Sequence, residues 1–349
     1  MSYRQPFGDK ANLKLMDKKR PVDLMRERGG SANIGTLEDG TIMETLNLSG
    51  RVLFIKERSV YEFRLADDID PNRENPNLPP SSHRLIVNLG TESEIFSRTF
   101  LTAKRLFKAE FLPSTIDVTQ SLFLTLEIVQ ELAALEKEIA DYLSAEKKLS
   151  NEYEDRKNKK LDHATPSIPD IKTRCKTIFQ KADQALQAQI DLIRIFYPNF
   201  SKTSYYKSFF EFIQTEYGEQ DDFTKFFQKI LPFILLVRNI RNCLDHRRTE
   251  TEIKDFELQI NANIISPTIE VNYLDSKMQR TSIAEFLPIV TQNLVMIFET
   301  TIAYLCSKQS KPNKIFPSEV MLIPEERRIN KNIRYAYWSP LGEGGYFHQ

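Results

Sequence analysis

The chain has 349 residues, of which 48 are basic and 48 acidic, so its formal net charge is zero. This balance excludes a global electric field that would gather nucleic acid, and any site for a polyanion must be local. Hydrophobic residues make up 41% and charged residues 28%, as in ordinary soluble globular proteins. The length fits one large domain or two smaller ones.

Cysteine and histidine usage narrows the chemistry. The cysteines are odd in number and far apart, which predicts neither a disulfide framework nor a Cys-x-x-Cys metal pair and fits a reducing cytoplasm: Cys175, Cys243 and Cys306. The four histidines lie in separate regions without zinc-ligand spacing, so we expect no metal and no cofactor. The N-terminus does not resemble a secretory signal, and charges interrupt the apolar stretches, so we expect no membrane span.

The first third of the chain predicts a small α+β region behind a polar arm. Residues 1–35 are polar and predict a flexible N-terminal arm, and residues 36–112 form the small α+β region. Alternating apolar residues within 42–65 predict two strands joined near Glu57-Arg58-Ser59, and Leu85-Ile86-Val87 predicts a third. Thr91 and Glu94 form a capping box that predicts a short helix to about Phe107.

Helical periodicity dominates the rest of the chain up to residue 307. Apolar residues at helical spacing predict long helices over about 116 into the 140s, 170–197, 222–246 and 282–306, with a short aromatic helix over 205–217. The charged run from 144 to 160 predicts a solvated helix end or a linker. Between 254 and 274 the period changes to two, which predicts a β-hairpin. Residues 308–349 form a C-terminal extension with a strand at Val320–Ile323.

The third long helix ends in Arg241-Asn242-Cys243-Leu244-Asp245-His246. A step of about 100° per residue separates the side chains of this helix into two faces. One face is apolar and contains Phe233, Val237, Ile240 and Leu244. The polar face contains Arg238, Arg241, Asn242, Asp245 and His246. The run therefore places a guanidinium, an amide and a titratable imidazole within two helical turns.

This run matches Arg-Asn-x-x-x-His, and in that respect the chain resembles the HEPN family of helical domains. A bare Arg followed by His also occurs at Arg156 and His163, but only Arg241 is followed by Asn. The resemblance covers about 113–307 and nothing before it. Together with the α+β region predicted over residues 36–112, the expected fold class is mainly α with an N-terminal α+β region. In that fold, residues 113–307 would be a HEPN-like bundle of four to five helices with a β-hairpin insertion.

The resemblance also implies an activity. HEPN ribonucleases cut single-stranded RNA without a metal and leave a 2′,3′-cyclic phosphate, and their domains usually dimerise with two motifs in one composite site. Carried onto this chain, the catalytic residues are Arg241, which stabilises charge on the phosphate, Asn242, which orients the pair or the substrate, and His246, the acid or base. A toxin or antiviral-defence role in the cytoplasm, with RNA, a second copy and a cognate inhibitor as partners, comes from this resemblance alone.

Neighbouring residues fit a supporting role or an ordinary structural one. Arg238, Arg247 and Arg248 are candidate substrate-binding residues, although cations near a helix C-terminus also stabilise the helix dipole. We expect Asp245 to pair with one of these arginines and Cys243 to be a packed core thiol. Two alternatives stay open: a non-catalytic HEPN-type module that dimerises and binds a partner or nucleotide, and a helical adaptor unrelated to that family.

Overall fold

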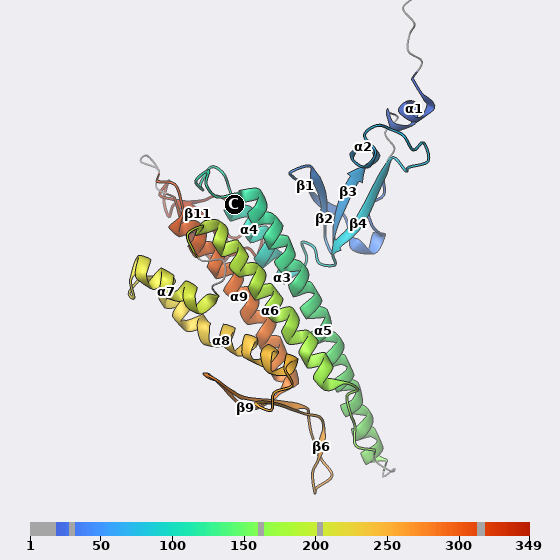
Figure 1. Cartoon of the computed structure of the whole chain (residues 1–349), viewed down its shortest axis with the longest axis vertical. Coiled ribbons are helices and arrows are strands. Elements are labelled where there is room, and N and C mark those ends of the chain that lie inside the picture. The colour runs from blue at the N-terminus through green and yellow to red at the C-terminus, as the bar shows by residue number, and fades with distance from the viewer. Residues whose placement is uncertain (1–18, 28–31, 160–163, 201–204, 313–317) are drawn as a thin grey trace, which may run out of the picture.

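The computed structural model describes residues 19–27, 32–159, 164–200, 205–312 and 318–349. A bundle of antiparallel helices forms its centre (Figure 1). Its members are α5 (Val118–Asn158), α6 (Ile171–Phe196), α7 (Tyr206–Tyr217), α8 (Asp222–Asp245) and α9 (Ile283–Lys308). The predicted helices are confirmed within a few residues, except that α5 continues through the charged run as far as Asn158. Much of the predicted arm over 1–35, and His163, lie outside the described residues.

Apolar stripes hold the bundle together. Helix α5 packs along α6, and both contact α9, while α8 packs against α6 and α7. The side chain of Asp117 caps α5 by accepting a hydrogen bond from the Gln120 amide at 2.9 Å. The buried residues of α5 recur at helical spacing: Leu122, Leu126, Val129, Leu132, Leu135, Ile139 and Tyr142.

A four-stranded antiparallel sheet, formed by the N-terminal part of the chain, lies beside α5 (Figure 1). Its strands follow chain order: β1 (Ile42–Leu48), β2 (Arg51–Lys56), β3 (Val60–Leu65) and β4 (Ser81–Val87). One face of the sheet supplies Leu53, Ile55 and Val60 to the main core. Short helical segments flank the sheet: α1 (Pro21–Glu27), η1 (Leu37–Asp39), α2 (Ala66–Ile69), α3 (Glu94–Phe96), the π-helix η2 (Ser97–Leu101) and α4 (Thr102–Leu106).

Two small sheets connect α8 to α9. A three-stranded sheet of order β5-β8-β9 contacts α8, and a two-stranded β6-β7 extension projects from it (Figure 1). The strands are β5 (Thr251–Lys254), β6 (Glu257–Leu258), β7 (Ile264–Ile265), β8 (Thr268–Tyr273) and β9 (Ser276–Ser282). The single hairpin predicted over 254–274 is therefore wrong, because β8 pairs with β5 and β9, while β6 pairs with β7. Strand β9 was not predicted, because it carries few apolar residues and shows no clear alternation.

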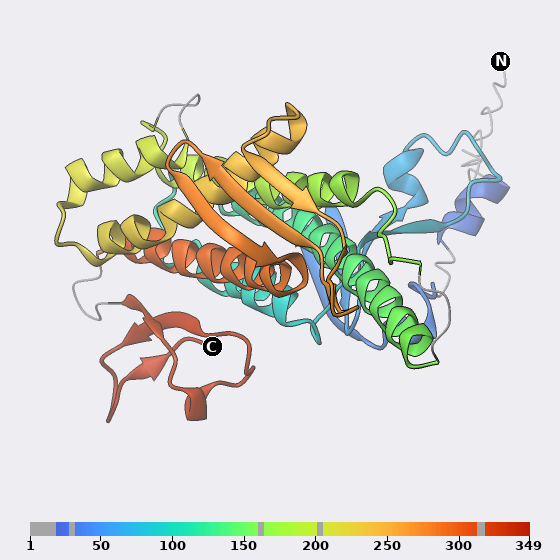
Figure 2. The same ribbon diagram turned by 90° about the horizontal axis from the view of Figure 1, so that it is seen from below.

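The C-terminal residues form a separate small sheet beside α9 (Figure 2). Its elements are β10 (Glu319–Leu322), η3 (Glu325–Arg327), β11 (Tyr335–Ser339) and β12 (Tyr346–Phe347). Arg334 joins this unit to α9, because its Nε donates to the buried Glu299 carboxylate at 2.8 Å. Arg98 donates to the same carboxylate at 2.9 Å from η2.

The predicted fold class, a mainly α HEPN-like bundle of four to five helices with one hairpin insertion, is wrong. The structure has 51% helix and 18% strand, with four separate small sheets and an N-terminal β region. Sequence periodicity favoured the bundle because long apolar stripes give a strong helical signal. Strands of two to seven residues, several of them largely exposed, give only a weak β-strand signal in the sequence.

Two of the core helices, α5 and α9, are long and apolar enough to span a membrane by length and composition alone. The most apolar 18-residue segment is 44% buried inside the protein in α5 and 61% buried in α9. Core helices of soluble proteins can have the same length and apolar composition. The prediction that no segment reaches that length is therefore wrong, although both helices pack within the bundle.

A buried acid on α5 makes stability depend on pH. Burial raises the pKa of Glu146, which is 6% exposed and lies beside the fully buried Tyr142. A raised pKa in the folded state favours the protonated acid, so its contribution to stability is present below the ordinary pKa and is lost as pH rises. We expect Glu146→Gln to be more stable than wild type at pH 7, with no difference below pH ~4. Urea unfolding of both proteins across this pH range measures the effect, and a constant difference would contradict it.

Candidate functional site

The predicted motif occupies the C-terminal end of α8. The helix closes with two backbone hydrogen bonds, from the His246 amide to the Asn242 carbonyl at 3.1 Å and from the Arg248 amide to the Cys243 carbonyl at 2.9 Å. Arg247 adopts a left-handed backbone conformation with φ of 50°. This is the geometry of a helix C-cap, a position that usually has glycine. The chain therefore turns sharply just after His246 and brings Arg247 and Arg248 beside the helix end.

Arg241 is held in a network of polar contacts. Its Nε lies 2.8 Å from Asp245 Oδ2, and its Nη1 donates to Asn242 Oδ1 at 3.1 Å. Lys176 of α6 pairs with the other oxygen of Asp245 at 3.1 Å. The Arg241 side chain remains 30% exposed. The network therefore fixes the direction of the guanidinium without covering it, as a group that binds phosphate requires.

Asp183 of α6 lies near Arg241 and makes further polar contacts. This acid is 2% exposed, and one of its oxygens lies 3.9 Å from Arg241 Nε. Its other oxygen accepts a hydrogen bond from the Tyr205 hydroxyl at 3.1 Å. The guanidinium of Arg238 lies 3.8 Å from the centre of the Tyr205 ring. Burial raises the pKa of Tyr205, so this phenol remains a neutral hydrogen-bond donor at physiological pH.

His246 projects from the helix end into solvent. It is exposed, and in the part of the chain that the structure describes its ring forms no hydrogen bond or ion pair. By contrast, Cys243 is fully buried and packs in the interior, as predicted. An exposed imidazole at the end of this helix is accessible to a substrate.

A hollow of about 710 Å³ adjoins the motif. Helix α6, the end of α8 and strand β5 form its walls, and its cationic lining residues are Lys172, Lys176, Arg247 and Arg248. Asp245 and Glu252 are the acidic ones, so the wall carries excess positive charge. Thr251 in this wall is 7% exposed, and its hydroxyl has no hydrogen-bond partner among the described residues. Excess positive charge suits a phosphate chain.

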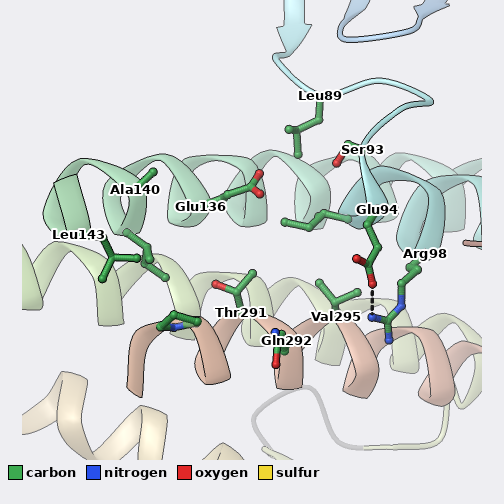
Figure 3. Close-up of a pocket in the computed structure, with 13 residues that line it drawn as sticks. Leu89, Ser93, Glu94, Arg98, Glu136, Ala140, Leu143, Thr291, Gln292 and Val295 are labelled. Atoms are coloured by element: carbon green, nitrogen blue, oxygen red, sulfur yellow. Dashed lines mark hydrogen bonds and ion pairs between the residues drawn. The ribbon is translucent and has the colours of Figure 1, made fainter. Parts of the chain in front are cut away.

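Another hollow, of about 510 Å³, lies between the α3 region, α5 and α9 (Figure 3). Its wall is mainly apolar, and its one cation, Arg98, is already paired with Glu94 and Glu299. Burial raises the pKa of Glu136, which also lines it. This hollow does not suit an anion, and none of the predicted site residues line it.

The structure therefore brings some of the predicted residues together and separates others. Arg241 contacts Asn242, and His246 lies one helical turn further along. Arg247 and Arg248 line the neighbouring hollow, whereas Arg238 lies over Tyr205 outside it. The prediction that Asp245 pairs with Arg238, Arg247 or Arg248 is wrong, because its partners are Arg241 and Lys176.

Sequence reasoning missed the contribution of α6, namely Lys172, Lys176 and Asp183. One signal was available, since Asp183 interrupts the apolar stripe of α6 next to Ala182 and Leu186. A carboxylate so close to a buried face needs a cation or a hydrogen-bond donor from another element.

Comparison of the chain with protein-family models, with curated proteins and with solved structures finds no match. Among the residues that the structure describes, no group of three His, Cys, Asp or Glu side chains is placed to hold a metal ion.

Proposed function

We propose that this protein is a metal-independent endoribonuclease that cuts single-stranded RNA and leaves a 2′,3′-cyclic phosphate. The observation that carries the proposal is that one helix end presents both an exposed histidine, His246, and the partly exposed guanidinium of Arg241, which is ion-paired with Asp245. The cation-rich hollow at the same helix end supports it, because an RNA strand needs sites for the phosphates that flank the cut. Arg247 and Arg248 line this hollow, whereas Arg241, Asn242 and His246 do not.

In the proposed reaction, the ribose 2′-oxygen attacks the adjacent phosphorus and the 5′-oxygen leaves. A base takes the 2′-OH proton, an acid gives a proton to the leaving oxygen, and His246 performs one of these transfers. Arg241 donates to the phosphate oxygens, whose negative charge increases in the transition state. Asn242 positions Arg241, and Arg247 and Arg248 bind flanking phosphates with Lys172 and Lys176. Because the substrate supplies the nucleophile, DNA should resist cleavage.

Two proton transfers require two groups, and the site in one chain presents one exposed imidazole. We therefore propose a homodimer in which two copies of the α8 end face each other and each contributes a His246. If so, an excess of His246→Ala protein mixed with wild type should reduce activity by more than dilution does. Because such a site is shared, mixed dimers would contain one histidine where two are needed.

The motif's resemblance to HEPN domains also leads us to propose a cytoplasmic toxin or antiviral-defence role with a cognate inhibitor protein. This part of the proposal depends on the six residues from Arg241 to His246 and not on the overall fold, which differs from the predicted bundle.

The proposal is tested by incubating mixed-sequence single-stranded RNA with the protein in EDTA. Wild type should cut RNA, leave 2′,3′-cyclic phosphate ends and spare an oligonucleotide of the same sequence made of DNA. His246→Ala should lower the rate by about 100- to 10,000-fold, the usual contribution of a general acid or base. His83→Ala is the matched control, since His83 is another exposed histidine but lies on β4. Cleavage that survives His246→Ala would refute the assignment.

The second candidate is a non-catalytic module that binds RNA or a nucleotide at the same surface. The ion pair of Arg241 with Asp245 favours it, because a carboxylate that already occupies the guanidinium competes with phosphate. This candidate predicts RNA binding by fluorescence anisotropy that Arg247→Ala and Arg248→Ala weaken, without any cleavage.

A further inference from the structure

Arg105 on α4 is a charged residue for which the described part of the chain supplies no counter-charge. Its guanidinium forms no hydrogen bond, ion pair or cation–π contact with any residue that the structure describes. Its Nη1 is shielded from solvent. Burial lowers the pKa of Arg105, and no neighbouring acid offsets this effect. Removing a guanidinium from water without a partner carries a large free-energy cost.

Elsewhere the chain pairs its shielded arginines. The side chain of Arg26 is 2% exposed and contacts Asp67 and Asp70. That of Arg98 is 13% exposed and contacts Glu94 and Glu299. Arg105 therefore departs from the pattern of this protein, and its missing partner is the feature to explain.

Arg105 lines a hollow of about 530 Å³ between α4 and the C-terminal segment. The hollow has two acidic side chains, and neither compensates Arg105. Glu44 pairs with Lys104, and Glu110 is exposed and forms no ion pair with Arg105 or Lys108. Among the described residues of this wall, the two cations Arg105 and Lys108 thus remain for an external anion.

The rest of the wall supplies further groups for a ligand. Asn330 and His348 add amide and imidazole groups, and Phe111 and Tyr346 add aromatic rings. The Nε2 of His348 lies 3.0 Å from Ser339 Oγ, which fixes the direction of its ring. Several donors around two cations match a phosphate group, which accepts hydrogen bonds on three oxygens. The volume suits a small organic molecule rather than a polymer.

We propose that this hollow binds a small phosphorylated compound, with its phosphate on Arg105 and Lys108 and its organic part against Tyr346. The bound compound would connect α4 to the C-terminal segment, because both contribute to the wall. This site shares no residue with the α8 motif or its hollow, so it stands or fails independently of RNA cleavage.

Thermal unfolding of the full-length protein tests the site. The additives are inorganic phosphate, adenosine monophosphate and acetate, each against sodium chloride at equal ionic strength. Adenosine monophosphate at a hundredfold excess over its Kd should raise the Tm by roughly 5 °C, and phosphate should raise it less. Acetate should have no effect beyond that of the salt. Equal shifts with acetate and phosphate, or no shift with any additive, would overturn the proposal.

Variants separate binding from structure. Arg105→Met keeps the length of the side chain and removes its charge, so it should raise the Tm without ligand and abolish the ligand shift. Arg105→Lys should fold with the wild-type Tm and weaken binding at least tenfold, because it keeps the charge but loses the planar fork. Arg156→Met, at an exposed arginine of α5, is the control and should change neither quantity. A lower Tm of ligand-free Arg105→Met would indicate a structural role for Arg105 and refute the proposal.

Discussion

Arg241→Lys is expected to lower the rate of RNA cleavage by about 100- to 1000-fold, close to the loss expected for Arg241→Ala. Arg241 is ion-paired with Asp245, although its Nε forms no aligned hydrogen bond with a described residue, and its Nη1 donates to Asn242. These two neighbours hold the plane of the guanidinium and leave its other N–H groups for a phosphate. A lysine ammonium keeps the charge but has no second nitrogen to replace these contacts together with a phosphate contact. Single-turnover cleavage with saturating protein measures this loss without the effect of weaker binding.

Arg174→Lys is the matched control, because Arg174 is a partly buried arginine of α6 that neither pairs with Asp245 nor lines the hollow. It should cut RNA at the wild-type rate. If Arg241→Lys also retained the full rate, Arg241 would contribute only its charge. The role of a bidentate phosphate ligand would then be excluded.

The α6 residues explain why Arg241 is held so firmly. Asp183 is buried and Lys176 shares Asp245, so each carboxylate near Arg241 also contacts a second group. The geometry of the guanidinium thus depends on α6 as well as on α8. If the proposed activity is correct, it therefore requires α6 to pack against α8.

The helices were predictable because two local sequence features, apolar periodicity and capping residues, agree with the way the helices pack. The long helices show apolar stripes at a period of 3.6, and Asp117 and Asp221 cap α5 and α8 with side-chain hydrogen bonds. Strands β1, β5, β9, β11 and β12 were missed, so the region 42–65 has three strands instead of the predicted two. Most of the missed strands are short or lack clear alternation. Their pairing is set by partners distant in sequence, as for β10 with β11, and single-strand patterns do not show such partners.

The candidate site was predictable only where it is local. Helical spacing placed Arg241, Asn242 and His246 on one face, because residues on a helix have fixed relative directions. The contacts of Arg241 with Asp183, and of Asp245 with Lys176, join residues 58 to 69 positions apart in the sequence. They follow from how α6 packs on α8, which no property of either helix alone determines. The unpaired Arg105 could not be predicted either, since the lack of a partner appears only in the folded chain.

Glu299→Ala is expected to lower the free energy of unfolding by about 3–5 kcal/mol, the largest stability effect that we predict for this chain. Glu299 on α9 is fully buried and accepts hydrogen bonds from Arg98 of η2 and Arg334 of the C-terminal unit. Its removal leaves Arg334 without its carboxylate and Arg98 with only Glu94. The hydrogen bond to Glu299 is also the main cause of the raised pKa of Arg334.

Urea unfolding at pH 7 measures this effect, and Glu127→Ala is the control because Glu127 is exposed on α5. The control should change the free energy of unfolding by less than about 0.5 kcal/mol. Adding Arg334→Leu to Glu299→Ala should recover part of the loss, since the second change removes one of the uncompensated charges. If the two losses simply added, the cost would come from the cavity at residue 299 and not from unpaired arginines. The attachment of the C-terminal unit to α9 would then depend on apolar packing rather than on this ion triad.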